Sequence, residues 1–167
     1  VFNNAGISLP YTLPGDLSGD EWRRAVDINL NGAFYTLSYA FKLMQEQSPQ
    51  GGRIINNGSI SAHVPRPGSI AYTATKHAIS GLTRAASLDG RAFSIAVGQI
   101  DIGNVASDMT EKMAKGVPQA DGTIKAEPRM DMASVVETFL TMTRLPLSAN
   151  ILFTTVMATN MPFVGRG

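Results

Sequence analysis

The sequence predicts an α/β fold in which a parallel β-sheet is covered on both faces by helices. Short segments rich in β-branched residues alternate with longer segments whose apolar residues recur at helical spacing. Glycine and proline residues separate these segments. With 167 residues, 44% of them hydrophobic, the chain can form one domain with a real core. This alternation of strands and helices is typical of parallel sheets.

The first part of the chain contains the end of a strand and a long helix. Val1 to Asn3 is predicted to be the end of a buried strand, and Asn4-Ala5-Gly6 the turn that leaves it. Ser18 and Glu21 have the spacing of a capping box, so a helix is expected to start there and run to about Gln47. One face of this helix is apolar, with Trp22, Val26, Ala33, Leu37, Phe41 and Met44.

The middle of the chain contains a second strand and a second long helix. Arg53 to Asn57 is predicted to be a strand that ends at Gly58-Ser59. Prolines make the following residues a loop. The next helix is expected from Ile70 to Asp89, with Ser69 as its N-cap and Gly90 just after its end.

The last part of the chain repeats the pattern. A third strand is expected over Phe93 to Val97, and a short helix near Met109 and Met113. Gly116 to Arg129 has the composition of a loop. Asp131 precedes a predicted helix from Met132 to Arg144, and Ile151 to Met157 is the final predicted strand.

Composition excludes several classes of function. The 14 basic and 13 acidic residues give a net charge of +1, with no basic run, so nucleic acid is not an expected partner. No apolar run is long enough to span a membrane, and none suggests binding to a membrane surface. The chain has no cysteine and two histidines, which argues against a metal site. The lack of cysteine is compatible with a reducing compartment, and a cytoplasmic location is expected.

Four residues are candidates for catalysis. Tyr72 and Lys76 are four residues apart on a predicted helix, so their side chains share one face. Ser59 follows a strand, at the edge of a parallel sheet where ligands bind. Asn29 interrupts an apolar stripe, where its amide must find partners. Taken singly, each residue also fits a structural role: a solvated helix pair, a turn serine or a core asparagine.

Together these residues resemble the short-chain dehydrogenase/reductase family, along the whole chain. Asn3-Asn4-Ala5-Gly6 is similar to the NNAG turn of the family, and Asn29 to the asparagine of its long helix. Ser59 and Tyr72-x-x-x-Lys76 match its serine and its tyrosine–lysine pair in order and spacing. Ile95 to Asp101 resembles the segment that approaches the nicotinamide. The resemblance implies the carboxyl-terminal part of a doubly wound, Rossmann-type parallel sheet.

Two departures from the family pattern stand out. Val97-Gly98 takes the place expected for a proline–glycine pair. No glycine-rich phosphate-binding loop occurs in the chain, although the family has one before the NNAG turn. We therefore expect residues 1–167 to be a single, partial Rossmann-type domain that lacks the amino-terminal glycine-rich strand–loop–helix region.

The resemblance implies hydride transfer between NAD or NADP and a carbonyl or secondary alcohol. Tyr72 would be the acid or base, with a pKa lowered by Lys76, and Ser59 would bind the substrate oxygen. Lys76 would hold ribose hydroxyls, and Asn29 would hold a water. The cofactor contacts implied are Asn4, Ala5, Gly6, Tyr72, Lys76, Gly98 and Ile100. The expected partners are a small alcohol or ketone and further copies of the chain, as a homodimer or homotetramer.

Several alternatives remain open from the sequence. The chain could be a catalytically silent oligomerisation or regulatory partner, and a sugar-nucleotide epimerase would also share the Tyr-x-x-x-Lys pair. The NNAG turn and the short carboxyl-terminal region argue against the epimerase. His63 fits a surface loop better than a substrate pocket, and His77 is expected to be structural. Met109 and Met113 could form a substrate lid or simply pack. Phe34, Tyr35 and Phe41 offer more aromatic area than one helix stripe can bury, which favours self-association.

Overall fold

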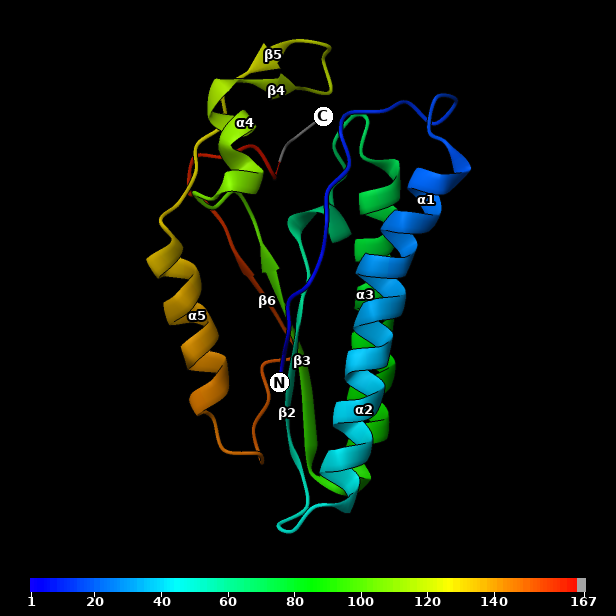
Figure 1. The fold of residues 1–167 in the computed structure, drawn as a ribbon. Helices are drawn as coiled ribbons and strands as arrows, with labels where there is room; N and C mark the ends of the chain where they lie inside the picture. The colour runs from blue at the N-terminus through cyan, green and yellow to red at the C-terminus, as the bar shows by residue number, and fades with distance from the viewer. Residues whose placement is uncertain (165–167) are drawn as a thin grey trace.

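A four-stranded parallel sheet forms the centre of the chain, and helices cover both of its faces (Figure 1). The computed structural model describes residues 1–164, without the side chain of Lys112. The strands lie in the order β1-β2-β3-β6 and all pair in parallel. They span Phe2–Asn3 (β1), Gly52–Asn57 (β2), Ile95–Ile102 (β3) and Phe153–Val156 (β6). The prediction of an α/β fold is confirmed.

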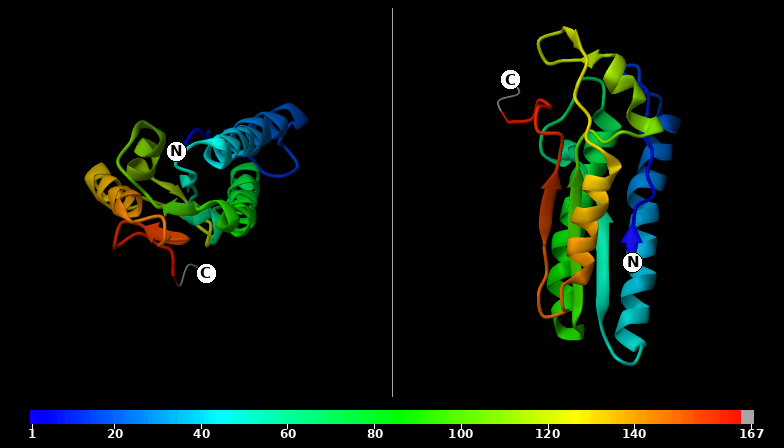
Figure 2. Two further views of the ribbon diagram at one scale, coloured as in Figure 1. Left: turned by 90° about the horizontal axis from the view of Figure 1, so that it is seen from below. Right: turned by 90° about the vertical axis from the view of Figure 1, so that its left-hand side faces the viewer.

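The long helices form a layer on each side of the sheet (Figure 2). On one side lie α2 (Gly32–Glu46) and α3 (Ile70–Asp89), with α1 (Gly19–Val26) extending the line of α2. On the other side lies α5 (Met132–Arg144). The strands end at one common edge, beside which lie α4 (Glu111–Lys115), β4 (Val117–Pro118) and β5 (Ile124–Lys125) (Figure 1). Short helical turns complete the fold: η1 (Asp27–Asn31), η2 (Ile60–Ala62), η3 (Gly90–Phe93) and η4 (Asp108–Thr110).

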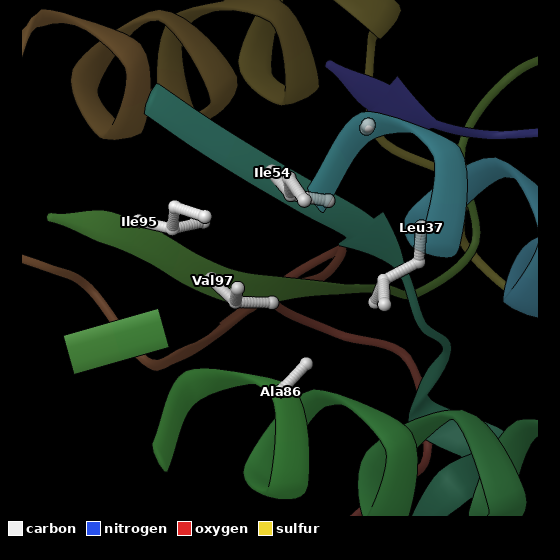
Figure 3. Packing of buried hydrophobic residues seen from close by; sticks show 6 residues of the cluster. Leu37, Ile54, Ala86, Ile95 and Val97 are labelled. Atoms are coloured by element: carbon white, nitrogen blue, oxygen red, sulfur yellow. The ribbon is translucent and has the colours of Figure 1, made fainter. Parts of the chain in front are cut away.

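The hydrophobic core is divided by the sheet, because alternate residues of a strand face opposite sides. One buried cluster joins the strands to α2 and α3 and contains Leu37, Ala40, Ile54, Ala86, Ile95 and Val97 (Figure 3). The other joins the strands to α5 and contains Ile55, Ile100, Val135 and Met142. Burying each of the large aliphatic side chains contributes roughly 1.5–3 kcal/mol. The core therefore holds the helices against the sheet below the edge where the strands end.

The first predicted helix is present but interrupted. Its start is confirmed: Ser18 accepts a hydrogen bond from the Glu21 backbone, and Glu21 accepts one from the Ser18 backbone. The π-helical turn η1 then separates α1 from α2, and Asn29 is its buried residue. Single π-helical turns inside α-helices often mark functional sites. Phe41 packs beside Phe93 against the core, so its predicted contribution to an exposed aromatic surface is wrong.

The end of α3 and the start of β3 differ from the prediction. Gly90 has an ordinary right-handed helical φ of −69°, and Ser94 has the left-handed φ of 56°. Phe93 lies in the turn η3, so the strand begins later than expected and runs five residues beyond Val97, to Ile102. Ser69 occupies the N-cap position of α3 without a capping hydrogen bond. The predicted loop from Gly116 to Arg129 contains the small antiparallel pair β4–β5.

A buried ion pair fastens the segment after β3 to the loop before α3. Arg66 donates to Glu127 through both terminal nitrogens, at 2.7 and 2.5 Å, and to Asn104 at 2.9 Å. The Glu127 side chain is 1% exposed. Burial raises the pKa of Glu127, but hydrogen bonds from Arg66, Gln119 and Asn104 and the Arg66 charge outweigh it and hold the pKa at about 2. The carboxylate is therefore charged at neutral pH.

We expect Glu127→Gln to lower the free energy of unfolding of the full-length protein by about 2 kcal/mol at pH 7, because Arg66 loses a buried charged partner. The folded-state pKa is depressed, so this stabilisation is complete above about pH 4.5 and is lost as the pH falls through about 2. Urea unfolding at several pH values measures both effects. Glu111→Gln, which removes an exposed pair with Lys115, is the control and should change little. Equal losses in the two variants would contradict the prediction.

Candidate active site

The edge where the strands end brings together the four candidate catalytic residues. Tyr72 and Lys76 lie in the first two turns of α3, and the Lys76 Nζ is 5.6 Å from the centre of the Tyr72 ring. Lys76 is 4% exposed, and its Nζ donates to the Asn57 carbonyl at 2.7 Å. That carbonyl belongs to the last residue of β2, two residues before Ser59. The helix and the strand are thus joined through the lysine.

Asn29 connects the long helix to the turn after β1 and to α3. Its Oδ1 accepts from the Ile7 backbone N–H at 2.7 Å, and its Nδ2 donates to the Ile7 carbonyl at 3.0 Å. The Nδ2 also lies 3.2 Å from Thr75 Oγ1, next to Lys76 in α3. The π-helical turn η1 places the amide, which is 2% exposed. The structure therefore shows a fully hydrogen-bonded Asn29 at the centre of the site.

The Asn4-Ala5-Gly6 turn passes close to this centre. A Cβ atom at Gly6 would lie 3.3 Å from Asn29 Oδ1 and 3.9 Å from Lys76 Nζ. Asn4 Oδ1 accepts from Asn57 Nδ2 at 2.7 Å. The Asn57 Oδ1 is buried and has no hydrogen-bond partner among residues 1–164. The turn and the end of β2 therefore leave one acceptor that a bound donor group can satisfy.

Ser59 is held by its own backbone and by the turn that follows. Its Oγ accepts from the Ser61 N–H at 3.1 Å and so caps η2. Its N–H donates to Asp101 Oδ1 at 2.9 Å. The Ser59 side chain also acts on the Tyr72 phenol and lowers the pKa of that phenol. The serine is 6% exposed, so its hydroxyl has a fixed environment.

The electrostatics of the pair differ from the sequence prediction. Burial raises the pKa of Tyr72, the Ser59 side chain opposes this, and the negative charge of Asp101 raises the pKa further. The expectation of a lowered pKa for Tyr72 is therefore wrong for the chain by itself. Burial lowers the pKa of Lys76 to about 8, against the effect of Asp101. At neutral pH the phenol is protonated and the lysine is mostly charged.

Two predicted cofactor contacts, Gly98 and Ile100, lie within a strand of the sheet. Both lie inside β3, between β2 and β6. The Ile100 side chain is 0% exposed, and its carbonyl accepts from the Gly58 N–H at 2.9 Å. The Gly98 backbone packs against the Ile151 carbonyl, so neither residue is free for a ligand. The glycine that follows the strand is Gly103, where a Cβ would lie 2.7 Å from Met157 Cβ.

The remaining candidates are placed as follows. His63 is exposed in the loop after η2, as predicted, but it is not without a partner: its Nε2 lies 2.8 Å from Asp101 Oδ2. His77 is exposed, and its Nδ1 lies 2.9 Å from the Thr73 carbonyl. Met109 is 49% exposed at the rim of the site. Asp101 is the important residue that the sequence analysis missed, although a polar residue in a strand of otherwise buried side chains was a usable signal.

Two shallow clefts open at this edge. One lies beside Tyr72, between the loop after the Asn4-Ala5-Gly6 turn and the start of α3. Its lining is mostly apolar, including Leu9, Pro10, Leu17, Ile70 and Ala71. The other lies between Ser8 and the η4–α4 segment, with Met109, Glu111 and Lys115. Ser8 borders both clefts, so the two are adjacent.

Residues 1–164 contain no cluster of three or more His, Asp or Glu side chains that could hold a metal ion. Among the same residues, no helix combines the length and the apolar character needed to cross a bilayer.

Comparison with known proteins identifies the family. Residues 1–118 match the sequence profile of the family described as short chain dehydrogenase. The chain is 37% identical over 134 residues to the uncharacterized oxidoreductase YohF of Escherichia coli, covering 79% of this chain and 49% of YohF. It is 33% identical over 130 residues to a 3beta-hydroxysteroid dehydrogenase of Mediterraneibacter gnavus, covering 78% of this chain and 46% of that protein. The chain thus spans about half the length of these relatives.

Solved structures show the same fold. The acetoin dehydrogenase YohF of Salmonella typhimurium superposes with a TM-score of 0.75 at 26% identity, covering 93% of this chain and 61% of that one. A 3-ketoacyl-(acyl-carrier-protein) reductase of Brucella melitensis, complexed with NADH, superposes with a TM-score of 0.78 at 20% identity. That match covers 93% of this chain and 64% of the reductase. The profile match over most of the chain, together with this fold, shows that the protein belongs to the short-chain dehydrogenase family.

Proposed function

We propose that residues 1–167 form the catalytic, carboxyl-terminal part of an oxidoreductase that transfers hydride between NAD or NADP and a carbonyl or secondary alcohol. The observation that carries this proposal is the junction of Tyr72, Lys76, Ser59 and Asn29 at the edge where the parallel strands end. Ligands of open parallel sheets bind at this edge. A partial Rossmann-type domain would depend on a preceding glycine-rich region for the phosphates of the cofactor.

Tyr72 is the group that gives or takes the proton. Its phenol is protonated at neutral pH, because burial and Asp101 raise its pKa, so it can donate to the oxygen of a carbonyl as that oxygen gains negative charge. Ser59, whose side chain also acts on the phenol, can donate to the same oxygen and stabilise its charge.

Lys76 and Asn29 support the tyrosine. The Lys76 ammonium lies beside the phenol ring and favours the phenolate that forms when the proton is given up. Asn29 holds Ile7 and the helix turn before Lys76 in place, so the turn after β1 keeps its distance from the lysine. Both amide hydrogens of Asn29 are already donated, to Ile7 and Thr75, so a water that returns the proton from solvent would bind at Lys76.

The residues present fit a nicotinamide dinucleotide. When bound, this cofactor supplies the hydride donor or acceptor at its nicotinamide ring. Gly6 leaves room for close approach to the backbone, and the unpartnered Asn57 Oδ1 can accept from a hydroxyl. Lys76 can exchange its bond with the Asn57 carbonyl for a bond to a ribose hydroxyl. Asn4 and Ala5 are exposed beside these groups, so their backbone can line the same site.

The substrate is best described as an apolar secondary alcohol or its ketone. The small cleft beside Tyr72 is lined mostly by apolar residues and carries no charged side chain, whereas the adjacent cleft carries Asp108, Glu111 and Lys115 on its η4–α4 side. The relative from Mediterraneibacter gnavus is named as a dehydrogenase of a hydroxysteroid, in which the alcohol lies on an apolar ring. Cyclic secondary alcohols are therefore the first class to test.

We expect Tyr72→Phe to lower turnover of cyclic secondary alcohols roughly 100-fold to 10,000-fold in the full-length protein, because the proton donor is lost. Absorbance of the reduced nicotinamide measures the rate, with both NAD and NADP. The exposed Tyr39, on α2, gives the matched control, because Tyr39→Phe removes an equivalent hydroxyl far from the site. Unchanged turnover in Tyr72→Phe would overturn the proposed function, and circular dichroism checks that both variants fold.

Self-association through α2 and α3 is part of the proposal. α2 exposes Phe34, Tyr35, Tyr39 and Leu43, and α3 exposes Leu88. Exposed apolar side chains gathered on two neighbouring helices are typical of a protein–protein interface. A homodimer or homotetramer would bury them.

We expect the full-length protein to be a dimer or tetramer by light scattering, and Leu43→Asp to dissociate it, because a charge would be buried at the interface. Leu43 is 64% exposed in the single chain. Leu147→Asp is the matched control: Leu147 is also exposed but follows α5, on the other face of the sheet. A wild-type monomer, or equal behaviour of the two variants, would contradict this assignment of the surface.

A further inference from the structure

A row of buried polar side chains crosses the sheet directly below the catalytic edge. Asn3, Asn56 and Gln99 are register partners on β1, β2 and β3. Their exposed fractions are 7%, 1% and 0%. All three face the side of the sheet that α2 and α3 cover. Two residues earlier on β2 and β3, the apolar side chains of Ile54 and Val97 face that same side. Buried polar groups in such a position must be hydrogen-bonded to one another or to the helices.

Hydrogen bonds connect the members of the row from β1 to β3. Asn3 Nδ2 donates to Asn56 Oδ1 at 3.1 Å, and Asn56 Nδ2 donates to Thr83 Oγ1 at 2.9 Å. Thr83 Oγ1 is 2.9 Å from Gln99 Oε1, and Gln99 Nε2 donates to Asp101 Oδ1 at 2.7 Å. Asn3 Nδ2 also donates to the Ala33 carbonyl of α2 at 2.8 Å, and Gln99 Nε2 to Ser80 Oγ of α3 at 3.0 Å. Such a chain polarises its members and stabilises a negative charge at its end.

Asp101 is the end of the row and the point where it meets the site. Its carboxylate is 0% exposed. Besides Gln99, it accepts from the Ser59 N–H at 2.9 Å and pairs with His63 Nε2 at 2.8 Å. Gly58 is required here, because a Cβ at that position would overlap the Asp101 carboxylate. The carboxylate therefore lies directly against the backbone that carries Ser59.

We propose that Asp101 is a positioning residue for the reaction: its carboxylate fixes the Ser59 backbone and supplies the fixed negative charge that Tyr72 and Lys76 face. This inference rests on the proposed function for its chemical role. The charged or titratable groups that interact with the carboxylate are Tyr72 and Lys76 from α3, and His63 from the loop after η2. β6 and residues 157–164 carry no charged side chain.

Hydrogen bonding alone does not require a carboxylate at this position. An asparagine could accept from Ser59 and Gln99 through its Oδ1 and donate to His63 in the other tautomer. A buried carboxylate costs several kcal/mol in lost hydration, which a neutral amide does not. Its distinctive contribution is charge: Asp101 raises the pKa values of both Tyr72 and Lys76. Burial is the larger cause for the phenol, and Asp101 adds to it; for the lysine, Asp101 opposes burial and so favours the cationic form.

The test is Asp101→Asn in the full-length protein, because this change removes the charge and keeps the shape. Ultraviolet difference titration follows the Tyr72 phenol directly, and Tyr72→Phe identifies its signal. We expect the phenol to titrate at a lower pH in Asp101→Asn than in the wild type. The pH profile of kcat/KM for alcohol oxidation should shift in the same direction. An unchanged phenol titration would overturn the inference.

A control and a second variant keep the result interpretable. Thr83→Val breaks the same polar row further from the site and should lower the melting temperature without moving the phenol titration. If Asp101→Asn does not fold, His63→Ala replaces it: water reaches the carboxylate, screens its charge, and the phenol titrates slightly lower. No shift in that variant would also overturn the inference. Failure of wild-type turnover would reject the proposed function, while the titration still decides the role of Asp101.

Discussion

The burial of polar groups at the carboxyl edge of the sheet is the constraint on which the rest of the structure depends. Asn29, Lys76 and Asp101 are each at most 4% exposed, and each is hydrogen-bonded to a different part of the chain. Because an unpaired polar group costs about 1–3 kcal/mol when buried, these bonds fix the segments around them. The turn after β1, the end of β2 and the start of α3 are held together by the polar side chains of the site, whereas the apolar core lies below them.

The fold was predictable where the signals are local. The bounds of α3 and α5 agree with the prediction because their helical periodicity and the residues at their ends are encoded within each segment. The predicted third strand ends too early, at Val97, because Gln99 and Asp101 have the polarity of a loop. In the structure Gln99 is hydrogen-bonded to Ser80 on α3 and to Asp101, and both residues pair with neighbouring strands. The π-helical turn at Asn29 had no local signature, since it accommodates the contact with Ile7.

The site could be predicted from the sequence where the spacing of its residues along the chain determines their position. Ser59, Tyr72 and Lys76 converge because a strand end and a helix start meet at one edge, which the order of elements implies. The pairing of Asp101 with Ser59 and His63 spans 42 and 38 residues and depends on the register of β2 with β3, which no single segment contains. β3 also runs past Gly98, so the glycine that follows the strand is Gly103. The two expected contacts, Gly98 and Ile100, therefore lie inside the sheet.

The charges of the site favour one direction of proton transfer before anything binds. Asp101 raises the pKa of Tyr72 and that of Lys76, so the pair rests as a neutral phenol beside an ammonium. If Tyr72 is the proton donor, this resting state is ready to reduce a carbonyl. Alcohol oxidation needs the phenolate, which becomes accessible when a further positive charge enters the site or the pH rises. The opposing charges of Asp101 and Lys76 therefore decide how much positive charge a ligand must bring before Tyr72 can lose its proton.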